Sequence, residues 1–392
     1  MFATKTSRRA FGLGTLAALA APCIARAASA EPIRIGWMQA LTGPSSAAGI
    51  GFHNGSTYAV NKHNAAGGRP IELIVRDTQG DPTKAVNAAQ ELIARSRVVA
   101  ILGPGNSGES LATTPIIARA GVPHMHGGTL DALIDPVKFP NAFRSGASNT
   151  EWSQASTHYV TDILKARKVA VFGDNTGYGM AAVQSSVTDL EQHGCTIAVQ
   201  SLVDPNQVDV SADMQRARQA GATAILAWTA STGLLARLLN TRDQLNWDLP
   251  VTGHPTLGSG EVGRLLARPQ NWEKVYPISF RNCSFDAAGK LPPRQEEFMR
   301  SLPSSIDMST SLMWLVSWGY DAVNLIASAV AKAGADDHAS IIAALNTTTN
   351  YPGIMGTYSF SPTNHNGFPA EEVVMVQANS FRNGSFMLAP GY

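Results

Sequence analysis

The sequence predicts an α/β protein of two doubly wound lobes, each a parallel sheet with helices on both faces, joined by hinge strands. Three observations support this prediction. Apolar runs of strand length alternate with helical stretches, a pattern typical of parallel sheets covered by helices. The alternation occurs in two successive sets, and 392 residues are enough to form two hydrophobic cores. The composition, 44% hydrophobic and 15% charged, is that of a globular protein.

Residues 1–30 are predicted to be an export signal and not part of the fold. Arg8 and Arg9 precede the apolar stretch 11–24, which is too short to span a bilayer well, and cleavage is expected near Ala30. The residues around the two arginines resemble the twin-arginine signal, which carries folded proteins across a membrane. The predicted location is therefore periplasmic, and the mature chain is not expected to span the membrane.

The charge balance excludes some partners. Residues 1–30 contain Lys5, Arg8, Arg9 and Arg26 and no acid, so 26 of the 30 basic residues remain against 29 acidic ones. Such a chain offers no basic field for nucleic acid or for an anionic membrane surface.

The three cysteines leave alternatives open. Cys23 lies in the signal, where a lipoprotein interpretation is disfavoured because Pro22 occupies a position that usually holds a small residue. Cys195 and Cys283 remain in the mature chain. An oxidising compartment permits a disulfide between them, but two separate buried thiols explain the sequence equally well.

The first set of elements follows from periodicity and capping residues. Ile71, Leu73 and Val75 alternate with polar residues, as in a strand. Asp81 and Pro82 are typical of a helix N-cap and first helical position. Strands are expected at 33–38, 71–75, 98–102 and 122–126, with helices between them that end near Gly67, Ser96 and Gly121.

The second set repeats this order. It begins with a helix at about 151–166. Strands are then expected at 168–172, 195–202, 223–228, 249–253 and 274–280, and helices at 180–194, 210–221 and 234–244.

The chain is expected to cross between the lobes near residues 143–145 and 280–282. A long helix at 311–332 would return to the first lobe, and strands within 371–378 and 385–390 would return to the second. The predicted first lobe is 31–145 with 282–370, and the predicted second lobe is 146–281 with 371–392.

Gly-rich loops follow the strands of both sets, and ligands bind at the carboxyl ends of strands in open parallel sheets. With two lobes facing each other, these loops would line one cleft. Helix N-termini in the same place favour an anion such as a carboxylate. The loops are 42–43, 103–107, 127–129, 173–179, 229–232 and 253–255.

No enzyme motif is complete in this chain. A nucleophilic Ser107 would need G-x-S-x-G, but the second glycine, Gly108, comes one place too early. A phosphate loop needs Lys where Glu109 stands, and the first strand lacks the dinucleotide-binding glycines. We therefore expect no enzyme activity and no cofactor.

Each candidate residue also has a structural interpretation. His124 and His126 would point to the same face of a strand, as two metal ligands can. The sequence shows no third ligand beside them, so a histidine in a pocket or in the core is the favoured interpretation, and no metal is expected. Ser107 and Thr129 suit helix caps as well as ligands. Trp228 suits the core as well as a cleft wall.

The order of these motifs resembles the branched-chain amino acid (Leu/Ile/Val-binding) group of type I periplasmic solute-binding proteins of ABC transporters. The resemblance covers essentially all of 31–392. The matching stretches are "IRIGWMQALTGPSSAAG", "AVNKHNAAGG", "RDTQGDPTKAVNAAQELI", "AILGPGNSGES", "FRSGASNTEWSQA", "GDNTGYG" and "SWGYDAVNLIASAV". Each stretch alone is weak evidence, but together the stretches occur in the same order as in the family.

The resemblance implies a Venus-flytrap that closes on a small carboxylate, amide or amino-acid-like ligand and delivers it to the permease subunits of an ABC transporter. It implies that Ser107, the backbone of Gly127 and Thr129 hold a ligand carboxylate, with Tyr178 as the aromatic residue of the second lobe. The full set of expected ligand-binding residues is Asn106, Ser107, His126, Gly127, Thr129, Tyr178, Ala230 and His254.

Departures from the family pattern bear on the ligand. The loop that usually carries an acid for the ligand's ammonium group reads Gly253-His254-Pro255-Thr256, and Ala230 lies in a loop that usually carries a tyrosine. An uncompensated ammonium in a closed cleft is costly. We therefore expect a carboxylate without the amine, including an aromatic one, or a small amide. A periplasmic sensor that presents its ligand to a membrane receptor is the alternative function.

Overall fold

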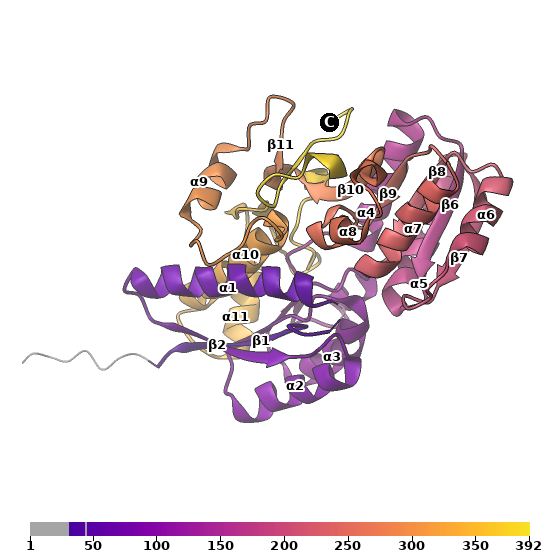
Figure 1. The fold of residues 1–392 in the computed structure, drawn as a ribbon. Helices are drawn as coiled ribbons and strands as arrows, with labels where there is room; N and C mark the ends of the chain where they lie inside the picture. The colour runs from indigo at the N-terminus through magenta and orange to yellow at the C-terminus, as the bar shows by residue number, and fades with distance from the viewer. Residues whose placement is uncertain (1–30, 44) are drawn as a thin grey trace, which may run out of the picture.

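The computed structural model describes residues 31–43 and 45–392. The predicted export signal lies outside these residues. Within them, no helix combines the length and the hydropathy that a membrane crossing requires. The chain forms two large sheets, each with helices packed on both faces (Figure 1).

The first sheet has five parallel strands in the order β2-β1-β3-β4-β5. Helix α1 covers one face, where it packs on Ile35 and Trp37, whereas α2 and α3 cover the other face around Met38. The elements are β1 Ile33–Gln39, α1 Ser46–Ala65, β2 Ile71–Asp77, α2 Pro82–Arg95, β3 Ala100–Leu102, α3 Ser107–Ala120, β4 His124–His126, the 3-10 turn η1 Asp131–Ile134 and β5 Ala142–Arg144.

The capping residues act as the sequence predicts. The Asp81 side chain accepts a hydrogen bond from the backbone N–H of Lys84, and Pro82 opens α2. Gly121 ends α3 in a left-handed conformation (φ +68°) that suits glycine.

The second sheet has six strands in the order β14-β10-β9-β8-β6-β7, and only β14 is antiparallel to its neighbour. Helices α4 and α5 cover one face, and α6, α7 and α8 cover the other. The elements are α4 Asn149–His158, continued by a π turn to Ile163, β6 Lys168–Asp174, α5 Gly177–Gln192, β7 Thr196–Val203, α6 Ser211–Gln219, β8 Ala224–Trp228, α7 Thr232–Gln244, β9 Val251–Gly253, α8 Gly260–Leu265, β10 Val275–Phe280 and β14 Val373–Met375.

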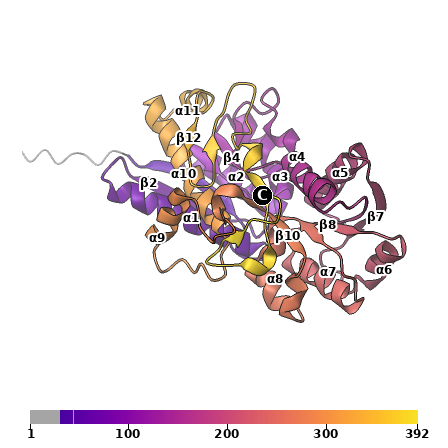
Figure 2. The ribbon, with the colours of Figure 1, turned by 90° about the horizontal axis from the view of Figure 1, so that it is seen from above.

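The C-terminal third of the chain runs back over the first sheet. Helix α10 packs along α1, as Figures 1 and 2 show, and brings Trp318 against Phe52 with ring centroids 4.6 Å apart. The remaining elements are β11 Ser284–Phe285, α9 Pro293–Ser301, α10 Met313–Ala333, α11 His338–Leu345, β12 Tyr351–Pro352, β13 Thr357–Tyr358 and β15 Phe386–Met387.

Two details complete the fold. Strand β15 pairs with β11 in a two-stranded sheet, and the residues after it pair with the end of β14, since Val376 and Leu388 form a bridge and the N–H of Ala389 donates to the carbonyl of Met375 at 2.9 Å. Cys195 and Cys283 are both buried free thiols. The Cys195 thiol faces the carbonyl of Ala166, whereas the Cys283 thiol faces Gln295, so the disulfide alternative is wrong.

Candidate functional site

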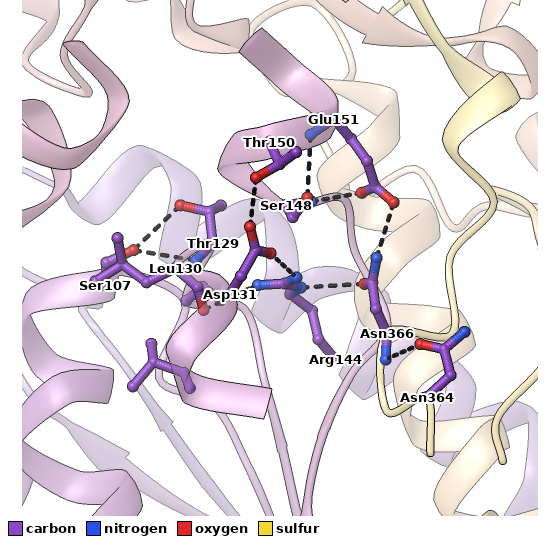
Figure 3. A network of polar contacts seen from close by, with 12 residues as sticks. Ser107, Thr129, Leu130, Asp131, Arg144, Ser148, Thr150, Glu151, Asn364 and Asn366 are labelled. Carbon is purple, nitrogen blue, oxygen red and sulfur yellow. Dashed lines mark hydrogen bonds and ion pairs between the residues drawn. The ribbon is translucent and has the colours of Figure 1, made fainter. Parts of the chain in front are cut away.

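The loops that follow β3 and β4 bring Ser107 and Thr129 together at the carboxyl edge of the first sheet. The Oγ of Ser107 accepts a hydrogen bond from the backbone N–H of Thr129 at 3.0 Å, and it lies 3.1 Å from the Thr129 Oγ1 (Figure 3). Both side chains are buried. Two hydroxyl groups carry two protons and use one between them, so the pair retains one O–H that can donate elsewhere.

Glycine is required in the turn that presents Ser107. Gly103 adopts φ +90°, and a Cβ there would lie 2.0 Å from the carbonyl oxygen of Met38 on β1. The next glycine, Gly105, donates its N–H to the side-chain oxygen of Gln39 at 2.8 Å. The loop is therefore fixed against β1 before α3 begins at Ser107.

Gly127 lies beside this pair but contributes differently from the expectation. Its N–H donates to the carbonyl of Pro104 at 3.0 Å, so that donor is already used within the protein. A Cβ on Gly127 would meet the Trp318 ring at 2.0 Å. In this geometry Gly127 allows close packing and does not offer a free N–H to a carboxylate.

The side chains of Asn106 and His126 form their hydrogen bonds with residues other than Ser107 and Thr129. Asn106 caps α3: its Oδ1 accepts from the N–H of Glu109 at 2.8 Å, and its Nδ2 donates to the Glu109 carboxylate. The His126 ring is buried, it lies 4.9 Å from that of His124, and its Nε2 is 3.4 Å from the carbonyl of Leu133. Within the described residues, no cluster of three or more potential ligands could hold a metal ion.

Three aromatic side chains from the second sheet's loops and helices contact one another. The His254 ring, which follows β9, lies 5.3 Å from that of Tyr178 in α5 and 5.4 Å from that of Trp152 in α4. Trp152 and Tyr178 are 6.4 Å apart. All three rings meet nearly edge to face, an arrangement that aromatic rings favour. We call this group the aromatic triad.

His254 is neutral in this environment. Burial lowers the pKa of His254 to about 3. Its Nδ1 accepts a hydrogen bond from the N–H of Thr256 at 3.1 Å, which assigns the proton to Nε2. The side chain therefore offers an uncharged N–H donor. Ala230, after β8, is half-buried and adds only a methyl group, while its neighbour Ser231 caps α7.

Several buried polar groups on α4, α5 and β8 have no hydrogen-bond partner among the described residues. They are the indole N–H of Trp152, the indole N–H of Trp228, the hydroxyl of Tyr178 and the side-chain amide of Asn149. Burial raises the pKa of Tyr178 well above its usual value, so its hydroxyl stays protonated. An indole N–H can only donate, whereas the Asn149 amide has both its Nδ2 and its Oδ1 unpartnered and can donate and accept. Since buried polar groups are normally paired, these groups would pair mainly with hydrogen-bond acceptors.

The two halves of the site are contiguous. The backbone N–H of Asn149, the first residue of α4, donates to the carbonyl of Thr129 at 2.8 Å. Asn149 and Trp152 are three residues apart on α4 and so share a face. Leu111 of α3 lies 3.5 Å from the position that a Cβ on Gly177 of α5 would take, so a helix of the first sheet touches a helix of the second.

Sequence reasoning missed Asn149 and Trp152. A signal was present, because Ser148 is a good N-cap directly after the predicted crossing, and it forms a capping box with Glu151. The face carrying residues 149 and 152 therefore begins directly after β5, the last strand of the first sheet.

Two surface hollows lie elsewhere, each with a volume of about 510 Å³. One borders the amino ends of β6 and β10, and the other borders the amino ends of β1 and β3. Both are at the sheet edges opposite to the hydroxyl pair and the aromatic triad, and neither includes any predicted site residue.

A family model described as periplasmic binding protein matches residues 32–384, so the chain belongs to the periplasmic binding protein family. This is a family of extracytoplasmic solute-binding proteins, and the predicted fold class and Leu/Ile/Val-binding resemblance are confirmed. A Leu/Ile/Val-binding protein homologue of Brucella melitensis is 26% identical over 375 residues, which cover 92% of this chain and 95% of that protein.

Two solved structures share the fold. The branched-chain amino acid substrate-binding protein LivJ of Streptococcus pneumoniae, in complex with isoleucine, has a TM-score of 0.78 and 23% identity, covering 91% of this chain and 98% of its own. A solute-binding protein of Rhodopseudomonas palustris, in complex with 4-hydroxybenzoate, has a TM-score of 0.78 and 19% identity, covering 92% of this chain and 96% of its own.

Proposed function

We propose that this protein captures a small solute that carries a carboxylate and no ammonium group, or a small amide, and delivers it to the permease of an ABC transporter. The solute would lie between the hydroxyl pair and the aromatic triad. The closing lobes are proposed to be 31–145 with 282–370 and 146–281 with 371–392. Export through the predicted twin-arginine signal is part of the same proposal.

The hydroxyl pair suits the carboxylate. Ser107 and Thr129 retain one O–H to donate, and Ser107 is the first residue of α3, a helix of 14 residues. The positive end of the helix dipole and its free N–H groups favour an anion there. The site does not need a basic side chain to hold a small carboxylate.

The absence of an acid from the loop after β9 carries the proposal, because the resemblance places the partner of an α-ammonium group in that loop. Tyr178, Trp152 and His254 are uncharged donors, and the loop after β9 holds no carboxylate. An ammonium group directed at this loop would lose its hydration without gaining a counter-charge there. An acceptor-bearing or aromatic solute would instead pair with the free donors and pack against the rings.

The two solved structures contain ligands of different classes, an amino acid in one and an aromatic carboxylate in the other. The relative that binds isoleucine and the one that binds 4-hydroxybenzoate have the same TM-score to this chain. The similarity of fold therefore does not separate an amino acid from an aromatic carboxylate, and the side chains of this chain favour the latter.

A thermal-shift screen of the chain from Glu31 onward tests the proposal. The panel contains leucine and isoleucine, benzoate and 4-hydroxybenzoate, short aliphatic carboxylates, and small amides including urea. A ligand present at about 100 times its Kd stabilises the folded state by about 2.7 kcal/mol. We expect carboxylates or amides to raise the melting temperature. A rise with leucine alone would contradict the proposal.

A further inference from the structure

Arg144 occupies the last position of β5, and its side chain is completely buried. The guanidinium donates hydrogen bonds to the loop 128–131 and to Asn366 (Figure 3). The Nη1 donates to the carbonyls of Gly128 and Leu130, each at 3.2 Å, and the Nη2 donates to the Asp131 carboxylate at 2.8 Å. Arg144 therefore holds both sides of the loop that carries Thr129.

Asp131 continues this chain of contacts into the second lobe. One carboxylate oxygen accepts from Arg144, and the other accepts from the hydroxyl of Thr150 in the first turn of α4. The neighbouring residue Asn149 donates its N–H to the carbonyl of Thr129. The ligand loop and α4 are thus joined at two adjacent points.

A third segment closes the network. The Nε of Arg144 donates to the Oδ1 of Asn366 at 3.1 Å, and the Nδ2 of Asn366 donates to the Glu151 carboxylate at 2.8 Å. The backbone of 365–367 also pairs with Arg144. Asn366 lies just before the chain enters β14 of the second sheet, so Arg144 contacts both the first crossing and the last one (Figure 3).

We propose that Arg144 is a positioning residue that couples the ligand loop to lobe closure, with Asp131 and Thr150 as the latch between the lobes. This inference rests on the proposed function, because it assigns the ligand to the Ser107–Thr129 pair. Arg144 and Asp131 touch no position assigned to the ligand. They set where the Thr129 loop lies relative to α4, and therefore how long a closed lobe pair retains its ligand.

The burial and the hydrogen bonds of Arg144 support a positioning role. A buried guanidinium is tolerated only when it is paired and fully hydrogen-bonded, and Arg144 has four hydrogen bonds to oxygen atoms. Asp131 is half exposed at the same place. Lysine cannot replace the planar guanidinium of Arg144, because an ammonium group is a point charge with no planar set of donors.

Thr150→Val tests the latch without touching Arg144. Thr150 is exposed, so the substitution leaves the core intact, and Thr188→Val on the exposed side of α5 is the matched control. Ligand release is followed by stopped-flow tryptophan fluorescence with the solute found in the screen. We expect the release rate to rise about five-fold with Thr150→Val, the value of one hydrogen bond to a charged group at a partly exposed site, while the association rate is unchanged.

Lobe separation is measured independently of any ligand. Cysteines introduced as Val137→Cys and Val208→Cys carry distance labels, because these positions are 92% and 86% exposed and follow η1 in the first lobe and β7 in the second. Cys195 and Cys283 are buried and would not be labelled. We expect Thr150→Val to lengthen the distance between the labels, with a larger effect for Arg144→Lys.

Equal distances in Thr150→Val, Thr188→Val and the parent chain would overturn the proposal. So would a release rate unchanged by Thr150→Val. If no solute of the panel binds, the proposed function fails, and the label distance alone decides the coupling.

Discussion

Trp152 and His254 meet edge to face, with ring centroids 5.4 Å apart and ring planes at 86°. One ring comes from the first helix after the chain enters the second lobe, and the other comes from a loop about a hundred residues later. Together with Tyr178 they give the second half of the site a neutral, donor-bearing wall.

Tyr178→Phe is expected to change binding and stability in opposite directions. The hydroxyl has no partner among the described residues, so its removal relieves a buried unsatisfied group and leaves the free energy of unfolding equal or higher. If the hydroxyl donates to the solute, the Kd rises by about ten-fold. Urea unfolding without solute and calorimetric titration with it measure the two effects. A large loss of stability would contradict a role at the site.

Ser107→Ala is expected to weaken binding by about 1–3 kcal/mol, because it removes a donor for the carboxylate and leaves the N–H of Thr129 without its acceptor. Ser110→Ala, in the same helix, is the control, since its hydroxyl reaches only the carbonyl of Pro104 at 3.3 Å. Titration of both variants with the same solute makes the comparison. Equal losses in the two variants would assign Ser107 to helix stability.

His254→Asp is expected to convert the preference of the site. A carboxylate at this position supplies the counter-charge that an α-ammonium group needs, so leucine should gain at least about ten-fold in affinity while bare carboxylates lose affinity. His254→Asn adds no charge and should not favour leucine. Competition titrations with leucine and benzoate measure the change. A failure of the aspartate to favour leucine would mean that the ligand's amine is not directed to this loop.

Glu109 is expected to make stability depend on pH. Burial raises the pKa of Glu109 from 4.5 to about 7, and the carboxylates of Asp81 and Asp77 add to the rise. The folded state therefore keeps a proton that the unfolded chain releases, so this contribution is present below about pH 4.5 and is lost as the pH rises through 7. At about 1.36 kcal/mol per unit, the loss is roughly 3 kcal/mol.

Glu109→Gln should remove that dependence. The variant should be more stable than the parent chain at pH 8 and similar to it near pH 4.5, as measured by urea unfolding at both values. Glu191→Gln, at an exposed position of α5, is the control. A variant whose advantage does not grow with pH would show that Glu109 does not titrate in this window.

The sequence predicted the fold well because strand and helix signals are local. Asp81 and Gly121 fix helix ends through their own backbone and side-chain chemistry, and the alternation along 71–75 needs no partner. The pairing of β15 with β11 could not be predicted in this way, because the two strands are far apart in the chain and meet only in the folded structure.

The candidate site was predictable where a residue type points to one role. Ser107, Thr129, Tyr178 and His254 follow strands, and the structure groups them in two contiguous halves. Asn106 and His126 occur in the same loops and have hydrogen-bond partners within the protein, and their role at a ligand stays a prediction. Trp152 was missed because its role depends on the packing of α4 against β9 and α5, which brings it to His254.

The packing of α10 on α1 has a consequence for biosynthesis. The five parallel strands of the second sheet lie within residues 168–280, so that lobe has its sheet and helices as soon as this stretch emerges. The first lobe must wait, because Phe52 of α1 is covered by Trp318, 266 residues further along the chain. During synthesis α1 therefore keeps an exposed apolar face until α10 has been made, close to the end of the chain.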